Sequence, residues 1–389
     1  MAYGRLNTPR FYMDANLLAY TTGMVDTGNS SDGNPMTIDE NESLFTLNPW
    51  RAKNMQVKTV ENGGLPRYIS YGGSTKMESS KIIPSLDWFG ILGIKKDSPA
   101  RPIGFTFGGF YENTNGILTG GGDITSTNII ESYGATDFSG RFGIQNGYFL
   151  ARFTNPYVNN VQNNEFYTTA SWYLTVGSSA GETPDVAANL EVAIGIGAYC
   201  CGWSYTPSAN PDLQLTESFS QDGVQSVRTI GGKDLTRINH TGCPQWLGDG
   251  LMPFQRSTTR NSVTDGERAT YLSTRKRWSM QFSYIDDTKL KPNFIHDNVN
   301  QTLNAPFTSS EITTSIDGVS ATNLTYTGIS DDFISKVWYG TMSGTLPFIF
   351  QPNKDVEEFH IVKFVDRNLE LQQVAANTFN VSFELEEVW

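Results

Sequence analysis

The chain of 389 residues contains little charge, little histidine and little cysteine. Charged residues make up 17% of it, well below the share of about 25% that is usual in soluble domains. Of the three cysteines, Cys200 and Cys201 are adjacent and Cys243 stands apart. Three thiols in so long a chain cannot supply the disulfide framework of a small secreted scaffold. The sequence therefore indicates a protein made in a reducing cytosol, with ordinary buried thiols.

Long apolar runs are also missing. The longest, Val192–Trp203, has twelve residues and is interrupted by three glycines. A membrane-spanning helix needs about 20 apolar residues, so this run is predicted to be a buried strand. The first residues of the chain lead into no apolar block and no small-residue cleavage site. We therefore expect neither a secretory signal nor membrane insertion.

Catalytic motifs are absent from the sequence as well. It has no G-x-S-x-G elbow before a helix and no phosphate-binding G-x-x-x-x-G-K-[ST]. A zinc site could draw ligands from His240, Cys243 and one of the two adjacent cysteines, since side chains of adjacent residues on a strand point to opposite faces. Structural zinc needs four ligands, and the sequence offers no fourth. We therefore expect no enzyme, no cofactor and no metal site. A glycoside hydrolase needs two carboxylates, and the 40 acidic residues leave that alternative open.

The scarce charges are unevenly placed along the chain. Lys and Arg number 28 against 40 Asp and Glu, which gives a net charge of −12. This balance disfavours nucleic-acid binding, because phosphate contacts need a basic surface. Bases gather at 256–277 and acids at 354–389. The two stretches are either solvated faces or patches of opposite sign that pair between copies of the protein. Under the second hypothesis the candidate subunit-interface residues include Arg275, Arg277, Glu384 and Glu386.

Aromatic residues and short strands dominate what is present. The chain has 23 Phe, 17 Tyr and 8 Trp, and its β-like runs are separated by linkers rich in Gly, Asn and Ser. Such spacing without helical periodicity predicts an all-β, mainly antiparallel fold with one or two short helices. We expect three parts. They are an N-terminal docking arm and loop at 1–42, an assembly domain with a split-barrel-like β fold at 43–84 and 206–389, and an inserted, jelly-roll-like β-sandwich at 85–205.

The N-terminal segment is predicted to be an extended arm, because the residue before Pro9 avoids the α region. Asp14 can cap a short helix over 15–22, which a glycine ends. Aromatic residues followed by a polar linker are poor material for an isolated core. Phe11 and Tyr12 are therefore predicted to contact a neighbouring subunit.

The C-terminal third has the clearest periodicity. Large apolar residues occupy every second position of 278–284 and again of 379–385, as in strands with one buried face. Apolar spacing of three and four residues predicts a helix over 331–339, with Ser330 as its cap. Two further short strands are predicted at 347–350 and 359–365.

Several aromatic residues fall at or near the predicted strand ends of the middle region. Exposed rings beside Asn and Asp can stack on sugar rings, whereas buried rings fill a core, which is the commoner situation. Both interpretations stay open for four candidate glycan contacts: Trp88, Tyr111, Trp203 and Tyr205.

Several segments resemble virion proteins of tailed bacteriophages. They are Arg277–Tyr284, Phe333–Tyr339, Leu346–Pro352, Phe379–Trp389 and the opening Leu6–Tyr12. The pattern is similar to a family of structural proteins from marine phages, and more loosely to distal-tail and baseplate-hub proteins. Ser85–Gly93 is similar to the opening of a sandwich that resembles carbohydrate-binding modules. The family implies no catalytic residues for this chain.

The resemblance implies a structural part of a phage tail, at the baseplate or distal tail or in a tail-associated ring. Such a part is made in the host cytoplasm and resides in the virion. Its partners would be copies of itself in a ring and other phage tail proteins, with no sequence-specific contact to nucleic acid. The alternatives are a host-glycan-binding adsorption protein of the virion, whose partner would be host surface polysaccharide, and a head decoration or collar protein.

Overall fold

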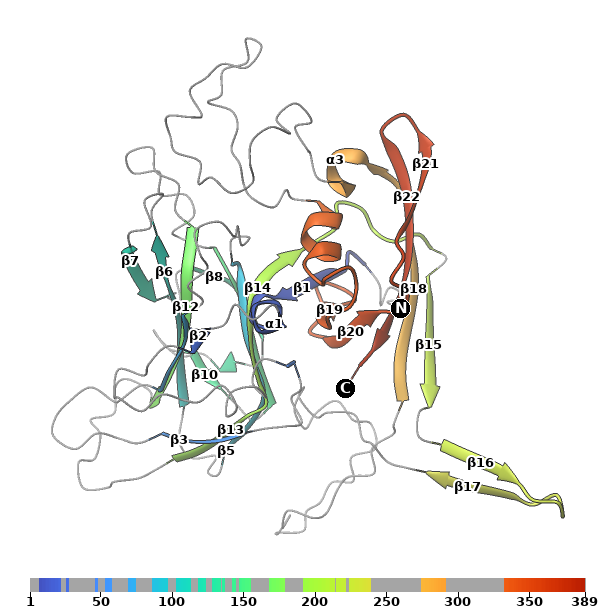
Figure 1. Cartoon of the computed structure of the whole chain (residues 1–389), viewed down its shortest axis with the longest axis horizontal. Helices are drawn as coiled ribbons and strands as arrows, with labels where there is room; N and C mark the ends of the chain where they lie inside the picture. The colour runs from blue at the N-terminus through green and yellow to red at the C-terminus, as the bar shows by residue number, and fades with distance from the viewer. Residues whose placement is uncertain are drawn as a thin grey trace.

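The computed structural model of the chain contains three antiparallel sheets and three short helices in the residues that it describes (Figure 1). The described residues are 7–21, 26–27, 46–47, 53–57, 69–74, 86–96, 103–112, 118–123, 128–133, 135–136, 142–144, 147–154, 168–178, 192–213, 215–221, 224–238, 274–291 and 332–388. The expected all-β fold with few helices is confirmed.

The largest sheet has 13 strands and runs through most of the molecule. Its main path is β15 (Thr216–Gln221), β18 (Thr274–Asp286), β22 (Thr378–Glu387), β20 (His360–Phe364), β19 (Phe348–Gln351), β1 (Arg10–Asp14), β14 (Ala198–Tyr205), β5 (Trp88–Lys96), β11 (Gly147–Phe153) and β8 (Ile129–Tyr133). Three strands lie off this path: β13 (Val192–Ile196), β3 (Lys53–Val57) and β21 (Glu370–Ala375).

Strands β18 and β22 follow the period-two pattern of the sequence. Every second residue of β22 is buried from Phe379 to Leu385, and in β18 the buried residues are Trp278, Met280 and Phe282. The two strands pair side by side, so their apolar faces join one core cluster. The strands predicted over 278–284, 347–350, 359–365 and 379–385 are confirmed as β18, β19, β20 and β22.

Strand β14 is buried on both faces. All eight of its residues are buried, and the neighbours Cys200 and Cys201 belong to two different core clusters. A strand covered on both sides reads as a continuous apolar run rather than an alternating one. This explains the run at Val192–Trp203, which forms β13 and β14 with a break at Gly197. Both described thiols are buried, as predicted.

Strand β1 lies in the middle of the large sheet and joins its two halves (Figure 1). On one side it pairs with β14 and on the other with β19, so that Phe11 lies opposite both Tyr205 and Phe350. All five residues of β1 are buried. The prediction of an arm that docks on a neighbouring subunit is therefore wrong for this segment, because the chain's own strands flank it on both edges.

Phe11 and Tyr12 point to opposite faces of the sheet and are fully buried. The Phe11 ring lies 5.4 Å from that of Phe350 and within about 6 Å of four other aromatic rings, those of Tyr205, Phe333, Phe348 and Phe383. The Tyr12 hydroxyl donates a hydrogen bond of 2.8 Å to the Gln351 side chain. Their predicted role in a subunit interface is therefore wrong for the folded chain, because neither ring reaches the surface.

The pairing of β1 with β14 depends on one glycine. A Cβ atom at Gly202 would overlap the carbonyl oxygen of Met13 and approach the backbone nitrogen of Ala15 to 3.0 Å. These contacts are to backbone, which cannot rotate away as a flexible side chain can. Glycine at 202 therefore lets the N-terminal strand and the start of the first helix lie directly against β14.

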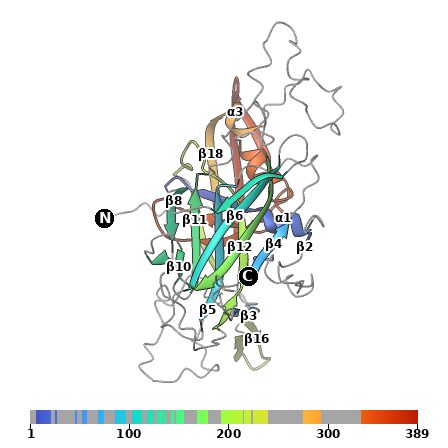
Figure 2. The same cartoon turned by 90° about the vertical axis from the view of Figure 1, so that its left-hand side faces the viewer.

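The second sheet has seven strands and lies beside the β5–β14 part of the large sheet (Figures 1 and 2). Its main path is β2 (Asp26–Thr27), β4 (Ile69–Ser74), β12 (Thr168–Ser178), β6 (Ile103–Glu112), β10 (Phe142–Ile144) and β9 (Ala135–Thr136), with β7 (Leu118–Asp123) paired to β6. Both sheets thus combine strands from 85–205 with strands from outside that range. The predicted domain boundaries at 84/85 and 205/206 are therefore not boundaries of the sheets.

Three short helices accompany the sheets: α1 (Ala15–Thr21), α3 (Asp287–Leu290) and η5 (Ile334–Tyr339), the last with π-type hydrogen bonding. The helix predicted over 15–22 is confirmed as α1. The predicted second helix is present as η5, where Oδ1 of Asp332 accepts a hydrogen bond of 2.7 Å from the backbone N–H of Ser335. The predicted cap Ser330 lies outside the described residues. None of the helices in the described ranges is both long enough and apolar enough to cross a membrane.

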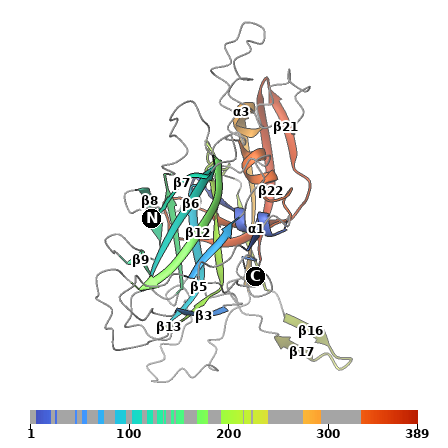
Figure 3. The same cartoon turned by 60° about the vertical axis from the view of Figure 1, so that its left-hand side comes forward.

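The third sheet is a hairpin of two strands, β16 (Val224–Arg228) and β17 (Asp234–Ile238). It follows β15 and projects away from the two large sheets, at the lower right of Figures 1 and 3. Its turn is ordered by hydrogen bonds between Thr229 and Lys233, and Gly232 takes a φ of +79° there. Only glycine adopts such a φ without steric cost.

Candidate functional site

The predicted interface residues meet within one chain, along strands β18 and β22. Arg277 lies opposite Glu386 in the antiparallel register, and its guanidinium is 3.1 Å from the Glu384 carboxylate. Both side chains of that ion pair are about two-fifths exposed, and exposed pairs contribute about 0–1 kcal/mol to stability. Arg277 and Glu384 thus pair with each other within the chain, and pairing of the two stretches between copies stays a prediction.

A second ionic cluster lies on the opposite, core-facing side of the same strands. The Lys276 ammonium is 2.8 Å from the Glu358 carboxylate. The His360 ring has carboxylates at both nitrogens, with Nε2 3.0 Å from Glu358 and Nδ1 3.0 Å from Glu387. Trp278 packs against the imidazole with ring centroids 4.8 Å apart. The apolar alternation of both strands therefore ends in charged residues, and the core closes there with an ion-pair network.

The network shifts the pKa values of its members in opposite directions. Hydrogen bonding from His360, together with that from Lys276, lowers the pKa of Glu358 to about 2 against the opposing effect of burial. Burial alone lowers the pKa of His360, but the hydrogen bonds to Glu358 and Glu387 outweigh it and raise that pKa above its ordinary value. These shifts favour an imidazolium held between two carboxylates. Because both ring nitrogens are engaged and the residue is buried, the cluster braces the sheet and offers no free catalytic base.

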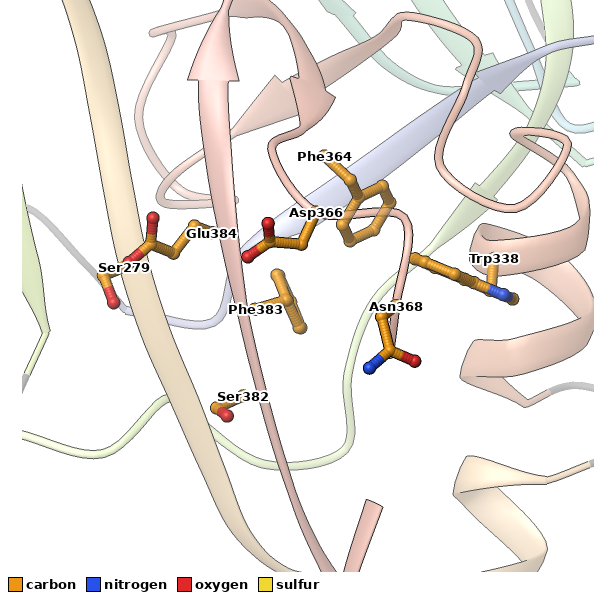
Figure 4. Close-up of a pocket in the computed structure, with 8 residues that line it drawn as sticks. All are labelled: Ser279, Trp338, Phe364, Asp366, Asn368, Ser382, Phe383 and Glu384. Carbon is orange, nitrogen blue, oxygen red and sulfur yellow. The ribbon is translucent and has the colours of Figure 1, made fainter. Parts of the chain in front are cut away.

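A pocket of about 190 Å³ lies where β22 passes from its pairing with β20 to its pairing with β21 (Figure 4). Carboxylates of Asp366 and Glu384 and the amide of Asn368 supply its polar lining. The other lining residues are Ser279, Trp338, Phe364, Ser382 and Phe383. In Figure 4 the Trp338 ring lies at the helix side and the Glu384 carboxylate at the β18 side. The pocket thus combines apolar rings with acidic groups, which suits an apolar group that carries positive charge nearby.

Three of the four candidate glycan contacts lie in the core and not at this pocket. Trp88, Trp203 and Tyr205 are buried, and their polar atoms donate to backbone carbonyls inside the fold. Trp203 Nε1, for example, lies 2.8 Å from the carbonyl oxygen of Lys336. A glycan contact at these three positions is therefore wrong for this fold, because a sugar cannot stack on a buried ring. Tyr111 belongs to β6, and its side chain lies outside what the structure describes.

Two acids, the buried Asp14 and the half-buried Asp87, brace β1 and β14. Oδ1 of Asp14 accepts hydrogen bonds from the backbone N–H groups of Asn16 and Cys201, at 2.9 and 3.3 Å, and burial raises the Asp14 pKa to about 8. Asp87 accepts from both the backbone N–H and the hydroxyl of Ser204. Burial raises the pKa of Asp87 as well. The described residues hold no group of three or more potential ligands placed to bind a metal ion, and His240, Cys243 and His296 lie outside them.

Sequence reasoning missed Lys276, Glu358, His360 and Glu387 as a cluster. A signal was present for two of them, because Lys276 and Glu387 occupy positions of the alternating pattern that are apolar elsewhere in the same strands. Charged residues at core positions indicate buried partners. The identity of the partners, however, required the register between β18, β20 and β22.

Comparison of the chain with protein-family models, with curated proteins and with solved structures finds no match.

Proposed function

We propose that the protein is a structural component of a bacteriophage tail, at the baseplate or distal tail or in a tail-associated ring, and that it self-assembles through its C-terminal β structure. The observation that carries the proposal is the set of large apolar side chains exposed after residue 205. Examples are Leu213, Phe219, Ile230 and Tyr284, each more than half exposed. Val227 and Leu235, which lie opposite each other across β16 and β17, are also more than half exposed, and adjoining exposed apolar side chains of this kind mark surfaces for protein contact.

The distribution of aromatic and charged groups supports the same proposal. Aromatic rings of the described core are used for packing, and the His360 cluster is closed by its own partners. A structural role needs a rigid sheet and outward-facing contact residues, whereas catalysis needs an accessible reactive group. The resemblance of the C-terminal segments to phage virion proteins gives the class of assembly.

The alternatives differ in what supports them. A glycan-binding role has little support, because three of its four candidate contacts, Trp88, Trp203 and Tyr205, are buried in the core. A head decoration or collar protein would use the same self-association and differs from a tail part in its position on the particle. The position in the particle therefore decides among the structural roles.

The test is localisation on assembled particles. Antibodies raised against the purified protein are applied to virions of the phage that carries the gene, and gold labels are located by electron microscopy. Labels on the tail or baseplate are the expected result. Labels on the head or collar would support the decoration alternative, and particles free of label and of its peptides by mass spectrometry would refute a virion role.

A further inference from the structure

The β16–β17 hairpin has the features of a contact element that the rest of its own chain leaves uncovered. It forms a sheet by itself among the described strands. Its cross-strand neighbours Val227 and Leu235 are 65% and 55% exposed, and Ile230 in the turn is fully exposed. An isolated two-stranded hairpin is at best marginally stable in water, so a partner surface that buries these side chains would stabilise it.

The tip of the hairpin is preorganised and carries positive charge. The Thr229 hydroxyl donates to the Lys233 carbonyl at 3.0 Å and accepts from the Lys233 backbone N–H at 3.1 Å, which fixes the turn around Ile230. Exposed Arg228 and Lys233 flank the turn, against the single acid Asp234. A fixed turn loses little conformational freedom on binding, which favours affinity.

The pocket of Figure 4, which is lined by β18, β22, η5, the end of β20 and the turn after it, has the complementary chemistry. Its volume of about 190 Å³ is many times the roughly 10–15 Å³ that one water needs in such a cavity, and is enough for a branched aliphatic side chain. Trp338, Phe364 and Phe383 supply apolar lining, and Asp366 and Glu384 supply acidic groups. Arg277 already pairs with Glu384, so the exposed Asp366 is the carboxylate better placed to meet an incoming cation.

We propose that the hairpin tip of one copy inserts Ile230 into this pocket of a second copy, with Lys233 approaching Asp366. The proposal rests on the proposed function and names the contact by which copies would assemble. A second copy is favoured as occupant because the tip is basic whereas the chain carries a net charge of −12. The tip and the pocket are different surfaces of the chain, so the contact is heterologous and can close into a ring.

The experiment measures self-association of the full chain by sedimentation velocity over a wide range of concentrations. Ile230→Asp is expected to weaken the association constant by at least about tenfold, equivalent to 1.4 kcal/mol. The matched control is Ile130→Asp, which changes another exposed isoleucine, in β8 rather than in the hairpin, and is expected to leave association unchanged. Circular dichroism of each variant confirms that the fold is retained.

A charge exchange tests the pairing itself. Lys233→Asp and Asp366→Lys are each expected to weaken association, and the double variant is expected to restore it. Wild-type association that Ile230→Asp leaves intact, or a double variant no better than the single ones, would overturn the hairpin contact while leaving self-assembly in place. A wild-type chain that stays monomeric throughout would overturn both. Binding to anionic vesicles that is lost in Ile230→Asp, with association unchanged, would assign the hairpin to a lipid surface and overturn the proposal.

Discussion

Replacing Phe11 by alanine tests whether the N-terminal strand belongs to the chain's own core. Phe11 is fully buried among five aromatic rings. A buried aromatic residue removes about 150–250 Å² from water, which at about 25 cal/mol per Å² stabilises the fold by about 4–6 kcal/mol. Alanine keeps part of that burial but leaves a cavity, so we expect a loss of about 3–5 kcal/mol.

Such a loss is a large part of the net stability of about 5–15 kcal/mol that is typical of native proteins. Urea unfolding followed by tryptophan fluorescence gives the measurement, at two protein concentrations. The control is Tyr284→Ala, which removes a 77% exposed aromatic residue from the same sheet and is expected to change stability by no more than about 0.5 kcal/mol.

The concentration series separates an internal strand from an arm that docks on a neighbour. An internal strand gives the same loss at both concentrations. A loss that disappears at high concentration, or a Phe11→Ala variant as stable as Tyr284→Ala, would refute the reasoning, because the ring would then be stabilised by another subunit or by nothing.

Three further outcomes follow from the structure. Gly202→Ala is expected to unfold at markedly lower urea than Gly231→Ala, whose added methyl meets nothing within 4 Å. The raised pKa of His360 adds stability that is present below its ordinary value of 6.5 and is lost as pH rises through the folded value. The cost of His360→Asn in urea is therefore expected to be larger at about pH 6 than at about pH 9, and equal costs would contradict the network. Cys200 and Cys201 are buried, and burial raises the Cys200 pKa, so a thiol reagent is expected to label neither in the native protein and both in urea; rapid native labelling would contradict their burial.

Strands β18 and β22 could be predicted from the sequence because each has one buried face. Period two in β18 and β22 reflects that burial directly. Helix α1 was predictable for a similarly local reason, the capping residue Asp14. Both features arise from residues that are close together in the sequence, so they can be predicted without knowledge of the fold.

The pairing of distant segments could not be predicted in this way. Phe11 and Tyr12 are equally apolar whether they pack on a second subunit or between β14 and β19, since composition does not specify the partner. The sequence likewise does not say whether Trp88 and Trp203 are exposed or buried, because their burial depends on the order of the strands in the sheet. The opposite charges of Arg277 and Glu384 indicate an ion pair. The sequence does not say whether that pair forms within one chain, because this depends on the register between β18 and β22.

The central position of β1 has a consequence for folding order. Arg10 pairs with Gln351, so the first strand is separated by about 340 residues from a strand that it must bond. At a synthesis rate of about 5–20 residues per second, that partner emerges from the ribosome about 17–70 s later. During this interval one edge of β1 has no strand to pair with, and unpaired edges invite aggregation. Contacts between residues far apart in sequence form slowly. We therefore expect the pairing of β1 with β19, which closes the large sheet, to be the slow step in folding.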